Sequence, residues 1–240
     1  MPQTKQTNKR RNIILIVLAV LVVLAGTVFI VRNRQQHNQQ SSADAPTVNT
    51  PAVTEGSTSN ALIIGNPNAP VTIVEYGDFK CPNCNKLYRG ALREIKKNYI
   101  DTGKAKLEFR NLPYISPDSR TAAEGAYCAN AQGVFEAYHN GVYDYIWDSY
   151  YRENKVSEGE STDVFTVQTL TDIATQAGAD PAEFAACLNQ QTYKDAVTAD
   201  LKASERDKAT GTPTVFIGNQ RIIGAQPYTV YSTLIEQELR

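Results

Sequence analysis

The chain has little cysteine, little histidine and almost no net charge, and each shortage excludes a class of protein. Its 240 residues include four cysteines and two histidines, with a formal net charge of −1. Four cysteines are too few for a small fold stapled by disulfides, so a core must do most of the stabilising. The near-zero charge gives no electrostatic argument for nucleic-acid binding. With 42% hydrophobic residues, the chain is long enough for one domain, or for a domain with an insertion.

Two of the cysteines, Cys81 and Cys84, stand three residues apart, between a strand-like run at 71–76 and a helical pattern. A Cys-x-x-Cys pair at such a junction is typical of a thioredoxin-like redox site. Pro82 suits a first helical turn, because it has no N–H to lose and its φ is already helical. We therefore expect Cys81 at a helix N-terminus, where free N–H groups and the helix dipole favour a thiolate. Cys84 lies one turn later, on the same face.

The same pair could instead be half of a zinc site, or two inert thiols. Zinc usually needs a second Cys pair or two nearby histidines. The remaining cysteines, Cys128 and Cys187, are far apart, and His37 and His139 show no ligand spacing. We therefore favour redox chemistry, and we expect neither a metal nor a cofactor.

The N-terminal part of the chain has the pattern of a membrane anchor. An apolar run occupies 13–31, and four basic residues precede it between positions 5 and 11. About nineteen helical residues would span roughly 28 Å, close to the thickness of a bilayer core. The basic flank predicts that 1–12 stays in the cytoplasm and that the body lies outside. A cleaved signal peptide is the alternative, with 43–45 as a cleavage-like triplet that lies far beyond the apolar run.

The rest of the chain divides into a polar tether and a folded part. Residues 32–60 are rich in Gln, Ser, Thr and Pro, which predicts a flexible linker. Strands are expected at 71–76 and 104–112, and a β-hairpin around the Gly-Asn turn at 218–219. Helices are expected at about 82–99, between 116 and about 210, and at 227–240, with a polar loop at 152–160. This order favours a four-stranded mixed sheet formed by 61–115 and 209–240, with 116–208 as a helical insertion.

Two features of the folded part have alternative interpretations. Glu75 interrupts an apolar strand, where a carboxyl is costly unless it has a function or a partner. It could relay a proton to or from Cys84, or it could be an exposed strand-end residue. Asp78 is expected to be a turn residue. The aromatic-rich segment 134–150 could bind peptides, although such a pattern more often belongs to a core.

The Cys-Pro-Asn-Cys motif at 81–84, Glu75 six residues before it, and Thr212-Pro213 before a hairpin together carry a family resemblance. The chain resembles the DsbA-like thiol–disulfide oxidoreductases of the thioredoxin superfamily, in their membrane-anchored branch, over about 62–240. The resemblance implies an α/β thioredoxin fold, in which a central mixed β-sheet is flanked by helices. It also implies an inserted all-helical domain and one preceding transmembrane helix.

The resemblance further implies a role for each matching residue. Cys81 matches the nucleophile that forms a mixed disulfide, and Cys84 matches the cysteine that resolves it. Pro213 matches the family's cis-proline, and the backbone of Thr212 would pair with an extended substrate. Glu75 matches the buried acid beneath the pair.

Between the cysteines, Pro82 and Asn83 would face the substrate. The best-known oxidases of the family have histidine at the position of Asn83. Asparagine can donate a hydrogen bond but carries no charge, so the oxidising strength depends on how far the pKa of Cys81 falls without that histidine. Lys80 places a positive charge nearby.

Cys128 and Cys187 lie on expected helices of the insertion. Some relatives carry a structural bridge between such helices, and here a bridge would close a loop of about sixty residues, worth roughly 4 kcal/mol in the chain-entropy model. Two separate buried thiols and a second redox relay are the alternatives.

The function that follows is that of an exported, single-pass membrane protein with its catalytic domain outside the cytoplasm, which oxidises thiols of exported proteins. The family implies a membrane quinone-linked thiol oxidase, DsbB-like or VKOR-like, as the partner that restores the disulfide. A disulfide reductase or isomerase using the same pair is the alternative, as is a tethered chaperone-like binding module.

Overall fold

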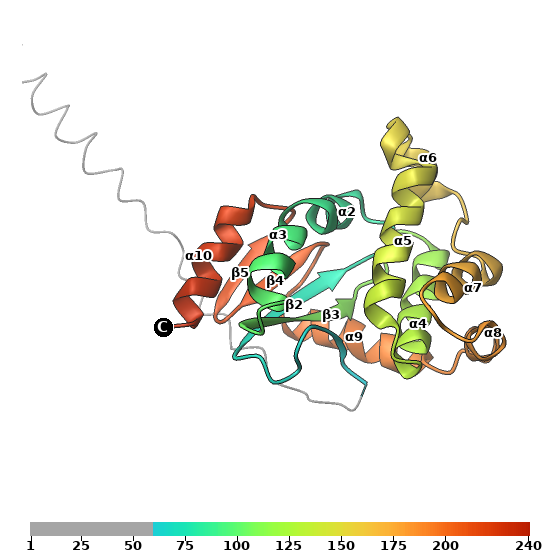
Figure 1. Cartoon of the computed structure of the whole chain (residues 1–240). Coiled ribbons are helices and arrows are strands. Elements are labelled where there is room, and N and C mark those ends of the chain that lie inside the picture. The colour runs from blue at the N-terminus through green and yellow to red at the C-terminus, as the bar shows by residue number, and fades with distance from the viewer. Residues whose placement is uncertain (1–59) are drawn as a thin grey trace, which may run out of the picture. The chain divides into compact units, whose positions relative to one another are not determined.

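The computed structural model describes residues 60–240, and a five-stranded mixed sheet runs through them (Figure 1). The strand order is β1-β3-β2-β4-β5, in which β2 and β3 are parallel and every other pair is antiparallel. The strands are β1 Leu62–Ile64, β2 Val71–Gly77, β3 Ala105–Asn111, β4 Thr214–Ile217 and β5 Gln220–Ile223. A prediction of four strands is therefore wrong, because β1 adds to the edge at β3. Three residues are too few for strand periodicity to be recognised in the sequence.

The central strand β2 sends alternate side chains to two separate cores. Ile73 lies in the larger core, together with both cysteines of the Cys-x-x-Cys motif. Val74 and Tyr76 lie in the smaller one, with Ala203 of helix α9 (Lys194–Arg206) and Phe216 of β4. Glu75, two residues after Ile73, therefore belongs to the face that carries the cysteines.

The helical stretch after β2 is continuous but kinked. It consists of α2 Pro82–Leu87, the π-helical η1 Tyr88–Leu92, α3 Arg93–Ile95 and the π-helical η2 Lys96–Ile100. The kink lies at Gly90, whose φ of −103° and ψ of −106° are not helical. The stretch ends within a residue of the expected position, and helix α10, Tyr228–Glu238, packs against it and against β4.

The segment between β3 and β4 is helical, as expected. It contains α4 Pro117–Ala131, α5 Phe135–Ser149, the 3-10 turn η3 Tyr151–Glu153, α6 Val156–Ser161, α7 Val167–Gln176, α8 Pro181–Asn189 and α9. The polar loop expected at 152–160 is wrong, since α6 forms there without any apolar periodicity. The aromatic segment belongs mainly to the core, because Phe135, Tyr138 and Tyr143 are buried.

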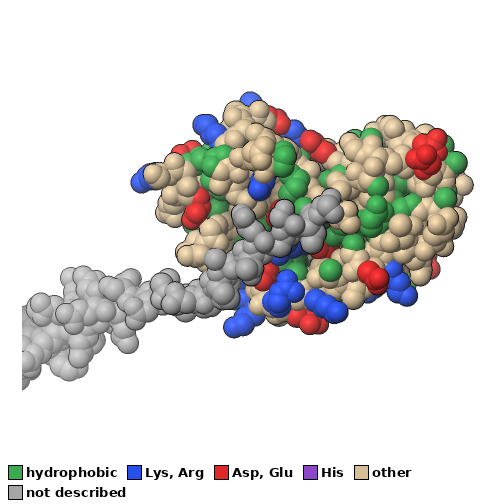
Figure 2. All heavy atoms as spheres, turned by 90° about the horizontal axis from the view of Figure 1, so that it is seen from below, with side chains coloured by type: hydrophobic (Ala, Val, Ile, Leu, Met, Phe, Trp, Pro, Cys, Tyr) green, Lys and Arg blue, Asp and Glu red, His purple; other side chains and the backbone are tan. Residues whose placement is uncertain are grey.

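The apolar run at 13–31 and the linker before residue 60 lie outside the described residues. Within 60–240, no helix is both long enough and apolar enough to cross a membrane. On the face that Figure 2 shows, acidic and basic side chains are interspersed rather than gathered by sign. Residues 60–240 all fall in one compact unit, so the boundary between sheet domain and insertion stays a prediction.

Candidate active site

Cys81 and Cys84 lie where β2 gives way to helix α2. Cys81 is the N-cap residue, with φ −74° and ψ 120°, and Pro82 follows at the first helical position. The backbone N–H of Cys84 donates to Sγ of Cys81 across 3.4 Å. Both cysteines are buried and neither is in a disulfide, so the site is shown as a dithiol. The expected placement of Cys81 at a helix N-terminus is confirmed.

The two thiols differ in acidity. Hydrogen bonds lower the pKa of Cys81 from 9.0 to about 7; the largest effect comes from the Cys84 thiol, and smaller ones from Thr212 and from backbone N–H groups. Burial raises the pKa of Cys84 well above its ordinary value, and the charge of Cys81 adds to the effect. At neutral pH the first sulfur is therefore a thiolate in a large fraction of molecules, while the second stays protonated.

The loop before β4 faces the first cysteine. The peptide bond between Thr212 and Pro213 is cis. The carbonyl oxygen of Thr212 lies 3.3 Å from Sγ of Cys81 and accepts the thiol hydrogen. Beside it, the side chain of Tyr114 is 58% exposed, and its hydroxyl lies 3.4 Å from Oγ1 of Thr212. Next to Cys81 in the chain, Pro82 is half-buried and Asn83 is exposed.

Glu75 is buried beneath the pair. Its exposed fraction is 2%, and Oε2 has no hydrogen-bond partner among the described residues. Burial, and then the charge of Cys81, raises the pKa of Glu75 from 4.5 to about 8. The alternative that Glu75 is an exposed strand-end residue is therefore wrong. A carboxyl with this pKa can take up and release a proton near neutral pH.

Asp78 organises the loops around the cysteines, which the sequence did not indicate. Its buried carboxylate accepts the N–H of Lys80 at 2.9 Å on one oxygen, and the N–H groups of Tyr114 and Ile115 at 3.0 and 3.1 Å on the other. It thereby joins the active-site loop to the loop after β3. The expectation that Asp78 is a turn residue is confirmed, because its carbonyl oxygen accepts the N–H of Cys81 at 2.9 Å and its carboxylate accepts that of Lys80. Its bonds to Tyr114 and Ile115, more than thirty positions away, could not be read from the local sequence.

Two further predicted positions lie in the insertion. Cys128 on α4 and Cys187 on α8 form a disulfide with an S–S distance of 2.02 Å, which ties these two helices together. His139 is buried among aromatic rings, where burial lowers its pKa to about 4. Within residues 60–240, no three His, Cys, Asp or Glu side chains are grouped so as to hold a metal.

In sequence and in fold, the chain is similar to known proteins. The family model described as Thioredoxin matches residues 57–237. The chain belongs to the thioredoxin family. Among its relatives is the disulfide bond formation protein D of Bacillus subtilis, which is 26% identical over 179 residues, covering 74% of this chain and 77% of the relative. A probable disulfide bond formation protein D of Bacillus cereus is 28% identical over 154 residues, covering 64% of this chain and 68% of that one.

Solved structures agree with the family. The crystal structure of oxidised BdbD from Bacillus subtilis matches with a TM-score of 0.59 at 26% identity, over 75% of this chain and 93% of that one. Alpha-DsbA1 of Wolbachia pipientis, at 21% identity, has the same fold with a TM-score of 0.62, over 76% and 92%. The chain is thus a DsbA-like thiol–disulfide oxidoreductase.

In this DsbA-like enzyme the cysteines and the proline loop are recognisable in the local sequence, but the polar residues that hold them are not. Lys80 was expected to place a positive charge near Cys81; its ammonium is fully buried against Asp118, 2.7 Å away. A weak signal existed, because a lysine between Phe79 and Cys81 interrupts an apolar stretch. Its partner, thirty-eight residues away in the chain, could not be identified from local pattern.

Proposed function

We propose that this DsbA-like enzyme is an exported, membrane-anchored oxidase that introduces disulfides into exported proteins. The observation that carries the proposal is the difference between the two thiols: the pKa of Cys81 falls to about 7, while that of Cys84 rises. A sulfur with a lowered pKa is both the better leaving group and the one stabilised in the reduced pair. The pair therefore favours release of oxidised substrate.

The reaction has two exchanges. A substrate thiolate attacks Sγ of Cys81 in the Cys81–Cys84 disulfide, and Cys84 leaves with the electron pair and takes up a proton. The substrate's second thiolate then attacks the substrate sulfur of the mixed disulfide, and Cys81 leaves as a thiolate. The substrate loses two electrons and two protons in forming its disulfide, and the enzyme pair gains two electrons.

Glu75 is the candidate proton carrier for the second cysteine. Cys84 must be protonated when it leaves and deprotonated when the pair is reoxidised. Glu75 lies on the same face of the sheet, is buried, and has a pKa of about 8. A group that titrates near the working pH can serve in both directions.

Substrate peptides would bind along the loop that carries the cis-proline Pro213. The exposed edge around Thr212, together with Pro82 and Asn83, offers backbone and small side chains to an extended chain. The carbonyl oxygen of Thr212 accepts the thiol hydrogen of Cys81. A substrate that paired with this backbone would therefore lie beside the sulfur that it must reach.

The oxidising direction is supported by relatives that are named disulfide bond formation proteins. Asn83 supplies no charge, and a Cys81 pKa of about 7 is near that of thioredoxin and well above that of DsbA. We therefore expect a reduction potential between about −270 and −120 mV, the values of thioredoxin and DsbA.

An extracytoplasmic location is supported by the disulfide between Cys128 and Cys187, because such bonds persist in oxidising compartments. We propose that 13–31 spans the membrane with 1–12 inside, that 32–60 is a linker, and that 61–115 with 209–240 carries the redox pair beside the helical insertion 116–208. A membrane quinone-linked thiol oxidase, DsbB-like or VKOR-like, would then restore the Cys81–Cys84 disulfide.

Trapping tests the mechanism directly. A Cys84→Ala variant expressed in the native cell should accumulate mixed disulfides through Cys81 with exported proteins and with the reoxidant, whereas Cys81→Ala should trap none. Measurement of the reduction potential tests the direction. A potential at or below that of thioredoxin would favour the reductase or isomerase alternative, and unchanged oxidation by Cys81→Ser would leave a chaperone-like module.

A further inference from the structure

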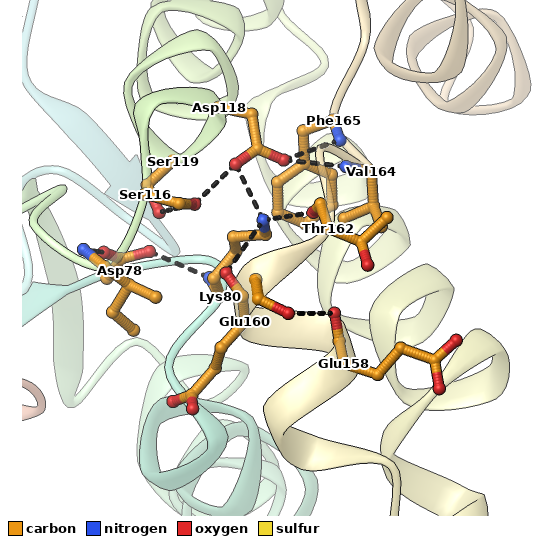
Figure 3. A network of polar contacts seen from close by, with 12 residues as sticks. Asp78, Lys80, Ser116, Asp118, Ser119, Glu158, Glu160, Thr162, Val164 and Phe165 are labelled. Carbon is orange, nitrogen blue, oxygen red and sulfur yellow. Dashed lines mark hydrogen bonds and ion pairs between the residues drawn. The ribbon is translucent and has the colours of Figure 1, made fainter.

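The residue immediately before Cys81 carries a buried ammonium group. The side chain of Lys80 has no exposed surface. Its Nζ lies 2.7 Å from Oδ1 of Asp118, and it donates to the carbonyl oxygens of Thr162 at 2.7 Å and Glu160 at 3.3 Å (Figure 3). Three acceptors match the three N–H donors of an ammonium. The charge is thus fully compensated, as burial in a protein interior requires.

The backbone of Lys80 is held as firmly as its side chain. Its N–H donates to Oδ1 of Asp78, and its carbonyl oxygen accepts the hydroxyl hydrogen of Tyr151. Each polar group of Lys80 therefore has a partner. Since Cys81 is the next residue, Lys80 connects its partners to the active-site loop.

Most of these partners belong to one short segment, residues 151–162, which we call the arm. It comprises η3 and α6, and it projects beyond the end of α5 (Figure 1). Lys80 holds the arm at both ends, through Tyr151 at the start and through Glu160 and Thr162 at the finish. The last carbonyl groups of a helix have no hydrogen-bond donors within the helix. At the end of α6, the Lys80 ammonium donates to two of them.

The middle of the arm is open to solvent. Arg152, Lys155 and Glu158 are exposed. At its base, Gly159 packs so closely on Tyr151 that an added Cβ would lie 2.6 Å from the ring. The arm also lies near the redox pair, because the charges of Cys81 and Cys84 contribute, after burial, to raising the pKa of Tyr151. The segment thus stands beside the cysteines while its outer surface remains free.

We propose that Lys80 is a positioning residue, which clasps the arm against the active-site loop so that the arm forms one wall of the surface that receives a protein substrate. The inference rests on the proposed role of Cys81 as nucleophile. A small dithiol needs access to one sulfur atom, whereas an unfolded polypeptide must also lie along the surrounding surface. Loosening the arm should therefore weaken protein oxidation and spare the oxidation of a small dithiol.

The test compares three full-length variants. Lys80→Met combined with Asp118→Asn removes both charges together, because a buried charge left without its partner would destabilise the fold. Tyr151→Phe releases the other end of the arm without altering charge. Tyr150→Phe is its matched control, since it removes a neighbouring hydroxyl that is not among the hydrogen-bond partners of Lys80.

For each variant we would measure kcat and KM with reduced, unfolded ribonuclease and with dithiothreitol, with a small disulfide in excess as the oxidant that restores the Cys81–Cys84 bond. We would also measure the pKa of Cys81 and the rate of tryptic cleavage after Arg152 and Lys155. In the Lys80→Met/Asp118→Asn variant, the hydrogen bonds between the Lys80 ammonium and the end of the arm are lost. Because the loosened arm should bind the polypeptide less well, KM for ribonuclease should rise about tenfold. Activity on dithiothreitol and the pKa of Cys81 should stay at the wild-type values. Cleavage in the arm should be about tenfold faster, since it reports local opening.

Two results would overturn the inference: equal losses on both substrates, or an unchanged KM for ribonuclease although the arm is cut faster. If the double variant does not fold, as judged by its thermal melting, the comparison of Tyr151→Phe with Tyr150→Phe decides, with a raised ribonuclease KM expected in the former alone. If the proposed function itself were wrong, the result would differ from both of these: Cys81→Ser would still oxidise ribonuclease and dithiothreitol.

Discussion

The backbone N–H of Cys84 points at Sγ of Cys81 from 3.4 Å, so the second cysteine stabilises negative charge on the first. The contact exists because Cys81 is the N-cap of α2 and its sulfur takes the place that a serine or aspartate oxygen takes in other caps. The same turn buries Cys84 completely. One local structure therefore makes one thiol acidic and keeps the other protonated.

Titration of Cys81 is the first prediction. In the folded protein the pKa of Cys81 is about 7, below the ordinary value of 9.0. The thiolate therefore stabilises the reduced fold, and this stabilisation is fully present above pH 9. This gain, about 3 kcal/mol, is lost as pH falls through 7. Ultraviolet absorbance of the thiolate should show the transition, and Cys81→Ser should abolish it. A midpoint near 9 would contradict the assignment.

Replacement of Asn83 tests the electrostatics of the motif. Asn83 is exposed and contributes a backbone hydrogen bond to Cys81 but no charge. Asn83→His should lower the pKa of Cys81 by about one unit, because a nearby imidazolium favours the thiolate, and should make the potential more oxidising by about 30 mV. Asn83→Gln, which adds size without charge, is the control and should leave both values unchanged. Equal shifts in the two variants would rule out the charge as the cause.

Glu75 should make stability depend on pH. Its folded pKa is raised from 4.5 to about 8 by burial and by Cys81, so the protonated form is favoured in the fold. The resulting stability is complete below pH 4.5 and is lost as pH rises through 8, by about 5 kcal/mol at most. Urea unfolding of the reduced protein at several pH values should show this loss, and Glu75→Gln should flatten the curve. A parallel curve in the variant would contradict the assignment.

Glu75→Gln should also slow the enzyme. Without a carboxyl that titrates, Cys84 loses its candidate proton carrier, and general acid–base contributions are commonly at least about a hundredfold. The rate of reoxidation by a small disulfide is the measurement, since that step deprotonates Cys84. Glu75→Asp keeps the carboxyl and should recover part of the rate. If Gln and Asp behave alike, Glu75 acts through packing.

Removal of the disulfide between Cys128 and Cys187 should destabilise the fold without altering the redox pair. The bond closes a loop of 59 residues in sequence separation, which is worth about 4 kcal/mol through the unfolded state. The midpoint of urea unfolding of the Cys128→Ala/Cys187→Ala variant should therefore fall, while its activity on dithiothreitol stays at the wild-type rate. Loss of that activity in the folded variant would indicate a redox relay.

Local patterns accounted for the redox pair and for much of the fold. The strand before Cys81, the proline after it and the Gly-Asn turn at 218–219 each act through neighbours in the chain, and the structure has β2, α2 and the β4–β5 hairpin there. The segment between 116 and about 210 was expected to be helical, and it is. The edge strand β1 and helix α6 were not expected, because their sequences are short and their partners are distant.

Local sequence was enough to predict where an acidic thiol forms, because a helix N-terminus needs few residues and all of them are adjacent. What surrounds that thiol depends on the whole fold. The burial of Glu75 depends on segments that are distant in the sequence and adjacent in the fold. The same is true of Lys80, whose ammonium pairs with Asp118. The energy of a charge depends on its burial and on its neighbours, and neither is a property of the local sequence.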